Sequence, residues 1–246
     1  MQVTKRILVL LTATTACLAS VEVIAQDSIA NSRIQNQEFY KGLIIPAALV
    51  GTGLLIKSDN QGLDIAIRTR RNESIPDFKK HADDYLQYFP IAAVYGLNAF
   101  GIKGKNNVGN SMAMLIKSEL LMLAITQPLK RWTNVVRPDG STDNSFPSGH
   151  TAQAFVAATF LHKEFGDKSI WYSVGGYTCA TAVGAMRILN NRHWLSDVLA
   201  GAGIGILSTN LVYYTHRYKW SKKSRHAVVM PTYGAGPGFY ICYNFK

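Results

Sequence analysis

From Tyr85 to Thr215 the chain is a succession of apolar segments separated by polar or charged stretches. The segments lie at 85–102, 108–129, 151–161, 169–186 and 198–215. Their lengths and patterns are typical of α-helices, and several approach the roughly 20 residues that a helix needs to cross a bilayer. The sequence therefore predicts an all-α fold for residues 85–216, a helical bundle with transmembrane helices. Gly201, Gly203 and Gly205 are expected to let two of these helices pack closely.

The N-terminal third divides into two parts. Residues 1–25 read as a signal peptide or an N-terminal anchor, because Lys5 and Arg6 precede an apolar run and Val23-Ile-Ala25 is a plausible cleavage site. Residues 26–84 hold an apolar segment at 42–56 and a basic connector after it. That segment is shorter than the span of about 20 residues, so its crossing of a membrane stays open.

The C-terminal tail, residues 217–246, is basic at first and then β-like. Two strand-like stretches, 228–233 and 239–245, flank Gly-Ala-Gly-Pro-Gly. They predict a short hairpin for which the sequence offers no function. Cys179 and Cys242 would remain after cleavage of a signal, so a disulfide is possible but not implied.

The formal net charge of +11 suggests anionic partners, such as lipid headgroups or phosphate esters. Nucleic acid is the other partner that a basic chain suggests. No nucleic-acid recognition module is visible and export argues against it, so no nucleic-acid partner is expected.

Two neighbouring stretches carry candidate binding residues. Lys130 and Arg137 are seven residues apart, almost two helical turns, and therefore leave one helix face together. Phe146-Pro-Ser148-Gly149-His150 then opens an apolar segment, with Ser as a helix cap and Gly allowing close backbone approach. A positive helix end with free N–H groups binds anions well. The simpler alternative is an ordinary basic helix end followed by a capped loop.

A third stretch favours the anion site. His193 and Asp197 are spaced i, i+4, so on a helix beginning near Trp194 the carboxylate can hold one imidazole nitrogen and leave the other exposed. Arg187 lies shortly before them and supplies a third fixed cation.

The order K-x6-R-P, P-S-G-H and R-x5-H-x3-D resembles the type-2 phosphatidic acid phosphatase family, which shares its core with bacterial acid phosphatases and vanadium haloperoxidases. The resemblance implies a helical phosphatase core at 85–216. It also implies a metal-independent hydrolase without cofactors, acting on a phosphate ester or diphosphate of a lipid. One position departs from the family, since Met186 stands where a serine usually precedes the arginine.

The resemblance also implies a role for each residue. Lys130, Arg137 and Arg187, with Ser148 and Gly149, bind the phosphoryl oxygens. His193 attacks phosphorus to give a phosphohistidine, and Asp197 fixes its tautomer. His150 protonates the leaving oxygen and later activates water. Metal ligation by His150, His193 and Asp197 is disfavoured, because three fixed cations around one small pocket would repel a divalent ion.

Other functions stay open. A lipid phosphatase acting on a phosphatidate-like lipid, a polyprenyl diphosphate or lipid A is favoured. A soluble-type exported acid phosphatase or a vanadium-dependent haloperoxidase would use the same pocket. A non-catalytic membrane protein is disfavoured, because every catalytic position is filled.

Localisation is expected at a bacterial inner membrane with the active site facing the periplasm, or otherwise at its periplasmic surface. The three motifs must share one end of the bundle. If 42–56 spans and the N-terminus is exported, counting crossings puts that end in the cytoplasm. If 42–56 is only half-buried, that end faces the periplasm, which agrees with the positive charges at Lys103, Lys105, Lys163 and the tail. The oligomeric state is not predicted.

Overall fold

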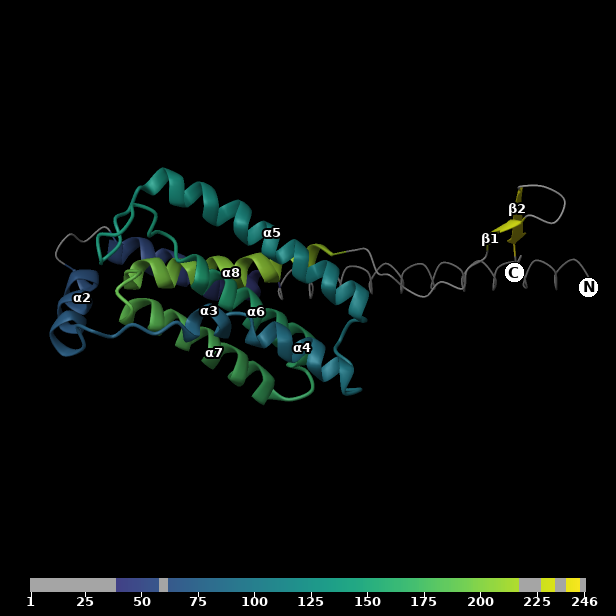
Figure 1. Cartoon of the computed structure of the whole chain (residues 1–246), viewed down its shortest axis with the longest axis horizontal. Coiled ribbons are helices and arrows are strands. Elements are labelled where there is room, and N and C mark those ends of the chain that lie inside the picture. Colours follow the sequence, from purple (N-terminus) through teal and green to yellow (C-terminus); the bar gives the residue numbers. More distant parts are fainter. Residues whose placement is uncertain (1–38, 58–61, 217–226, 233–237, 244–246) are drawn as a thin grey trace, which may run out of the picture.

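A computed structural model describes residues 39–57, 62–216, 227–232 and 238–243. The expected signal or anchor at 1–25 and the basic start of the tail lie outside these ranges. Within them the chain forms a bundle of helices and one separate pair of strands (Figure 1). The elements are a helix at Phe39–Lys57, α2 (Leu63–Ser74), α3 (Ala82–Leu86), α4 (Phe89–Ala99), α5 (Val108–Thr133), α6 (Gly149–Phe165), α7 (Ile170–Leu189), α8 (Leu195–Thr215), β1 (Ala227–Thr232) and β2 (Gly238–Tyr243).

The long helices begin at residues that cap them. The side chains of Asn107, Ser148 and Ser169 accept hydrogen bonds from backbone N–H groups in the first turns of α5, α6 and α7. Such caps satisfy donors that a helix start would otherwise leave unpaired. After α5, Asn134 adopts a left-handed conformation (φ 45°), and the chain turns toward α6.

Helix α6 is the centre of the bundle and contacts α4, α5, α7 and α8. Its close approach to α8 depends on glycine. A Cβ at Gly201 would lie 2.5 Å from the Ser148 carbonyl oxygen, and one at Gly205 would lie 2.3 Å from that of Ala152. No side chain fits at these distances, so the predicted close packing through this glycine series is confirmed.

The helix Phe39–Lys57 is longer than the apolar run that suggested it. It lies along α8 in the opposite direction: the Phe39 ring is 4.3 Å from the Tyr214 ring, and a Cβ at Gly53 would be 2.8 Å from the Ser196 carbonyl oxygen. Lys57 therefore lies at the end of the bundle where α8 begins.

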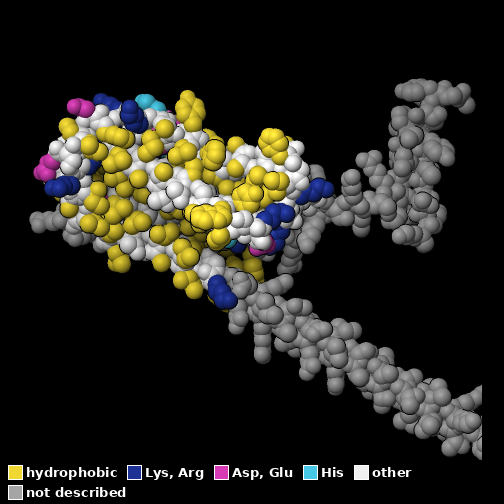
Figure 2. Space-filling view, turned by 90° about the horizontal axis from the view of Figure 1, so that it is seen from below, with side chains coloured by type: hydrophobic (Ala, Val, Ile, Leu, Met, Phe, Trp, Pro, Cys, Tyr) yellow, Lys and Arg dark blue, Asp and Glu magenta, His cyan; other side chains and the backbone are white. Residues whose placement is uncertain are grey.

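Three helices of the described chain are long and apolar enough to cross a membrane, namely Phe39–Lys57, Val108–Thr133 and Leu195–Thr215. On the face seen in Figure 2, hydrophobic side chains form a broad area and charged side chains gather toward its two ends. Large apolar side chains such as Phe100, Leu120 and Trp171 are exposed. This surface suits a lipid environment, and the predicted all-α transmembrane bundle is confirmed.

The predicted hairpin is also present. Strands β1 and β2 pair antiparallel, with Val228 opposite Cys242 and Met230 opposite Tyr240. Cys179 is a free thiol in α7.

The three motif segments share one end of the bundle, as expected. This end contains the last turn of α5, the start of α6, the end of α7 and the start of α8 (Figure 1). The connector before α4 reaches the same end, because Arg71 of α2 donates a hydrogen bond of 2.8 Å to the Leu189 carbonyl oxygen.

Candidate active site

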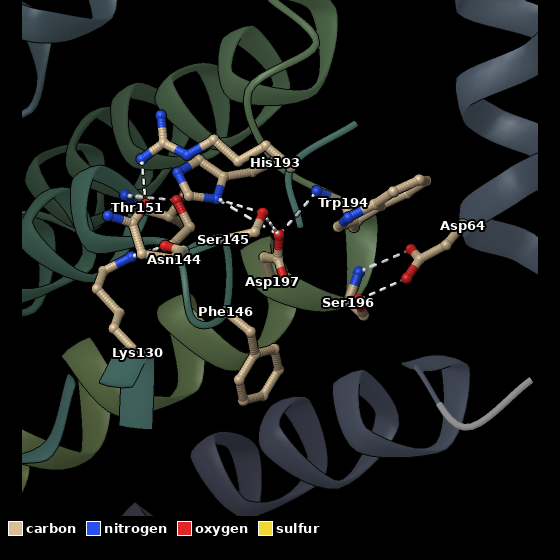
Figure 3. Close-up of polar contacts among 12 residues, drawn as sticks. Asp64, Lys130, Asn144, Ser145, Phe146, Thr151, His193, Trp194, Ser196 and Asp197 are labelled. Carbon is tan, nitrogen blue, oxygen red and sulfur yellow. Dashed lines mark hydrogen bonds and ion pairs between the residues drawn. The ribbon is translucent and has the colours of Figure 1, made fainter. Parts of the chain in front are cut away.

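The cations of the first motif meet at Asn144. Lys130, in the last turn of α5, donates through Nζ to the Asn144 carbonyl oxygen at 2.9 Å (Figure 3). Arg137 donates through one terminal nitrogen to the Asn144 side chain at 3.0 Å. A Cβ at Gly149 would lie 3.7 Å from Cε of Lys130, so the first residue of α6 lies beside this lysine. The structure thus brings the first and second motifs together.

Ser148 ties the second motif to the third. Its hydroxyl accepts a hydrogen bond from the Thr151 N–H and lies 2.9 Å from the Thr151 hydroxyl. Its own N–H donates to the Asp197 carbonyl oxygen at 3.0 Å. The side chain is buried, and its hydroxyl caps α6. Its predicted contact with a phosphoryl group stays a prediction.

His193 and Asp197 stand together at the start of α8. Nδ1 of His193 lies 3.4 Å from Oδ2 of Asp197, the arrangement that the i, i+4 spacing predicts. The same oxygen accepts the Trp194 N–H at 2.9 Å and a short hydrogen bond from the Ser145 hydroxyl (Figure 3). The hydroxyl is 3.4 Å from Nδ1. Since Nδ1 faces Asp197, Nε2 is the ring nitrogen directed away from this carboxylate.

Burial makes this imidazole a neutral base. His193 is 3% exposed, and the loss of solvent lowers its pKa to about 4. The Asp197 carboxylate raises the pKa, while Lys130 and Arg187 lower it. The imidazole therefore keeps a free lone pair at neutral pH, and two cations from distant parts of the sequence act on the same ring.

Arg187 is buried at the end of α7. One terminal nitrogen lies 2.5 Å from Oδ2 of Asp83 and 3.7 Å from Oδ1 of Asp84. Nε of Arg187 and Nε of Arg137 are buried and find no hydrogen-bond acceptor among the described residues. Buried donors that lack a protein acceptor suit a site that receives an anionic group.

His150 has a carboxylate partner that the sequence did not reveal. Its Nε2 lies 2.9 Å from Oδ1 of Asp84. Asp83 and Asp84 fall in the stretch interpreted as a basic connector, and no spacing rule relates them to His150 or Arg187. Ser145 was likewise missed, because its contact with Asp197 exists only in the folded chain.

A cavity of about 560 Å³ opens beside His150 and Arg187. Its wall is largely charged or polar and includes Lys79, Lys80, His81, Asp84, Asp139, Asn190 and Arg192. Asp139, to which the sequence assigned no chemistry, pairs with Arg192 at 3.1 Å on this wall. A separate and apolar cavity of about 410 Å³ lies between α4, α6 and α7.

Over the described ranges, no group of three or more His, Cys, Asp or Glu side chains is arranged to hold a metal ion. His150, His193 and Asp197 accordingly do not form such a group. Independence of metal ions stays a prediction about the reaction.

Known proteins resemble the chain over its helical part. It is 39% identical over 175 residues to a lipid A 1-phosphatase of Porphyromonas gingivalis, covering 65% of this chain and 39% of the relative. It is 31% identical over 136 residues to phosphatidylglycerophosphatase B of Bacillus subtilis, covering 50% of this chain and 64% of the relative. The chain thus spans from about two fifths to two thirds of the length of these curated relatives.

Among solved structures, the crystal structure of Aquifex aeolicus LpxE is similar with a TM-score of 0.48 and 23% identity, over 63% of this chain and 96% of that one.

The fold and the site define a helical membrane protein with a buried histidine and converging cations at one end of its bundle. The model of the PAP2 superfamily matches residues 112–221, so this part of the chain is similar to that superfamily.

Proposed function

We propose that this protein is a phosphatase that removes a phosphoryl group from a lipid phosphate through a phosphohistidine intermediate. The observation that carries the proposal is His193: a buried, neutral imidazole backed by Asp197 and under the influence of Lys130 and Arg187. The PAP2 match and the two lipid phosphatases among the relatives support the same class of substrate.

The first step forms a bond between Nε2 of His193 and phosphorus and breaks the bond between phosphorus and the leaving oxygen. The electron pair of the broken bond stays on that oxygen, which takes a proton from His150. Lys130, Arg137 and Arg187 offset the charge of the other phosphoryl oxygens. Asp197 accepts the Nδ1 hydrogen of the ring and stabilises its positive charge.

The second step reverses these roles. Neutral His150 takes a proton from water, the water oxygen bonds to phosphorus, and the bond to His193 breaks to release inorganic phosphate. Every proton that is transferred and every atom that forms a bond in this scheme comes from the chain, the substrate or water.

The test is phosphate release by the purified protein in detergent from a panel that includes a phosphatidate, a polyprenyl diphosphate and lipid A. We expect release from at least one of them in the presence of EDTA. Loss of activity on chelation, restored by a divalent ion, would contradict the metal-independent scheme. Halide oxidation with added vanadate, without phosphate release, would favour the haloperoxidase alternative instead.

We also propose that the active end of the bundle faces the periplasm. The opposite end carries Lys41, Lys103, Lys105, Lys163 and Lys168, and cytoplasmic loops favour such residues. If the helix Phe39–Lys57 crosses the membrane, this orientation requires residue 39 to lie on the cytoplasmic side. If residue 26 were exported, residue 39 would lie on the periplasmic side and the active end in the cytoplasm. A periplasmic active end therefore requires that the N-terminus is not exported.

Labelling of single cysteines tests this orientation. In a variant whose native cysteines are replaced, Ser141→Cys at the active end and Lys168→Cys at the other end are both exposed positions. A membrane-impermeant maleimide added to spheroplasts should modify the first and not the second. The opposite pattern would place the active end in the cytoplasm.

A further inference from the structure

The helix α3 lies outside the segment that defines the superfamily match, yet it sends two carboxylates to the site. Asp83 and Asp84 are in its first turn. Asp83 is 1% exposed and bonded to Arg187, whereas the side chain of Asp84 is 43% exposed and faces the polar cavity. These adjacent residues therefore serve different partners.

The position of α3 is fixed by contacts to the end of α7. The Asn190 side chain accepts the Lys80 N–H at 2.9 Å and donates to the Lys80 carbonyl oxygen at 2.7 Å. It also lies 3.4 Å from Oδ1 of Asp83. Since Arg187 and Asn190 belong to the same turn of chain, the two carboxylates are held at a defined place beside the phosphoryl site.

The distances show that Asp83 is closest to Arg187 and Asp84 is closest to His150. The charge of Arg187 is met first by Asp83 at 2.5 Å. Asp84 is 3.7 Å from Arg187 but 2.9 Å from Nε2 of His150. A charge-assisted hydrogen bond of this length favours the protonated, positively charged imidazole.

On these contacts, and resting on the phosphatase function proposed above, we propose that Asp84 is a positioning residue for the leaving-group proton. It accepts the Nε2 hydrogen of His150, holds the ring in orientation and favours its charged form against burial and the charge of Arg187, which lower the pKa of this ring. Nδ1 of His150 is then the nitrogen that gives its proton to the leaving oxygen and takes one back from water.

Several other charged groups share the surroundings of His150. Burial and the charge of Arg187 on α7 lower the pKa of His150, whereas Asp84 and Asp83 of α3 raise it. Lys130 of α5 lies beside the preceding Gly149. The cavity wall adds Lys79, Lys80, His81, Asp139 and Arg192. Asp84 is the carboxylate in direct contact with the ring, so its removal should change the proton affinity of His150 more than any other single carboxylate would.

The test compares Asp84→Asn with wild type on two substrates that differ in the leaving group. A lipid phosphate releases a poor leaving group and needs the acid, whereas 4-nitrophenyl phosphate releases a stable phenolate and does not. We expect Asp84→Asn to reduce turnover of the lipid phosphate roughly 10- to 100-fold, a part of the effect of a general acid. Turnover of 4-nitrophenyl phosphate should change less than about 3-fold, and the alkaline limb of the lipid-phosphate profile should move to lower pH.

A second measurement does not depend on turnover. In protein with labelled histidines, the NMR signal that disappears in His150→Ala reports the titration of His150. Asp84→Asn should lower its midpoint by about one pH unit. Asp77→Asn is the matched control, because Asp77 is an exposed carboxylate of the same connector, and it should leave activity and midpoint unchanged.

Equal losses on both substrates with an unmoved midpoint would show a structural role and overturn the proposal. Faster turnover with an unmoved midpoint would show that Asp84 obstructs the site, and would overturn it equally. If the wild type hydrolyses neither substrate, the phosphatase function is what fails, and the titration alone decides whether Asp84 controls His150.

Discussion

The site contains two pairs of a histidine and a carboxylate, built in different ways. His193 and Asp197 are four residues apart, both are buried, and the start of α8 fixes them. His150 and Asp84 are 66 residues apart, and their side chains are 36% and 43% exposed on a cavity wall. The first pair is local and dry, whereas the second is assembled by the tertiary fold and is accessible to water.

This difference matches what the two histidines are proposed to do. A nucleophile must keep its lone pair free, and burial achieves this by disfavouring the charged ring. A group that gives and takes protons must exchange with water and reach its charged form. The half-buried His150 ring meets water at the cavity wall, and Asp84 opposes the lowering of its pKa by burial and Arg187. The environment, and not the residue type, separates the two roles.

The strongest way to break the comparison is to remove each imidazole. His193→Ala should reduce phosphate release by at least about 10³-fold, because no nucleophile remains. His150→Ala should still form a phosphoenzyme from 4-nitrophenyl phosphate and then hydrolyse it slowly. A quench in alkaline denaturant, in which phosphohistidine is stable, followed by its detection measures this. A phosphoenzyme in His193→Ala would refute the assignment of the nucleophile.

Acid should affect the buried pair through stability. The pKa of His193 is about 4 in the folded chain, below the ordinary value of 6.5, so the unfolded chain binds the proton more readily. The stability due to the neutral ring is fully present above pH 6.5 and is lost as pH falls toward 4. The loss is on the order of 3 kcal/mol well below pH 4. Thermal unfolding in detergent at pH 7 and pH 4.5 measures it, and His193→Gln should reduce the difference.

Ser145 sharpens the comparison, because it belongs to the buried pair alone. Its hydroxyl donates to Asp197 and lies beside His193. A hydrogen bond to a charged group contributes about 1.5–3 kcal/mol, so Ser145→Ala should reduce kcat/KM roughly 10- to 100-fold with either substrate. Ser74→Ala, at the exposed end of α2, is the control and should retain full activity. An unchanged rate in Ser145→Ala would mean that Trp194 suffices to hold Asp197.

The smallest expected effect concerns the distance between helices α6 and α8, which carry residues of the two histidine–carboxylate pairs. Gly205 sets the distance between α6, which carries His150, and α8, which carries Asp197. Gly205→Ala should cost about 1–3 kcal/mol of stability by overpacking against Ala152. Gly175→Ala on α7 meets nothing within 4 Å and should be neutral or slightly stabilising. Unfolding temperatures in detergent compare the two, and equal values would contradict the packing argument.

Periodicity and local spacing predicted much of the fold. They failed where contacts with residues distant in the sequence determine where a helix begins or ends. The segment 151–161 becomes a helix that continues to Phe165, because the charged Glu164 is buried against Asn106 and Tyr213. The apolar run 42–56 lengthens to Phe39–Lys57, because two aromatic residues and Lys41 extend the helix at its start and Lys57 extends it at its end. The expected helix at 85–102 divides into α3 and α4.

The same distinction holds for the site. His193 and Asp197 are neighbours along one helix start, so their spacing in the sequence was enough to pair them. Asp84 meets His150 only because Arg71 and Asn190 fasten the connector to the end of α7. No sequence pattern around Asp84 or around His150 predicts that contact, so it could be found only from the folded structure.

The glycine-mediated contact of the helix Phe39–Lys57 with Ser196 has a practical consequence. This helix rests on the backbone that opens α8, immediately beside the buried pair. A shortened protein that began at residue 112 would retain every residue of the three motifs. It would still lack this support, together with both carboxylates of α3. The smallest unit that holds the whole proposed site is therefore larger than the segment 112–221 that matches the superfamily model.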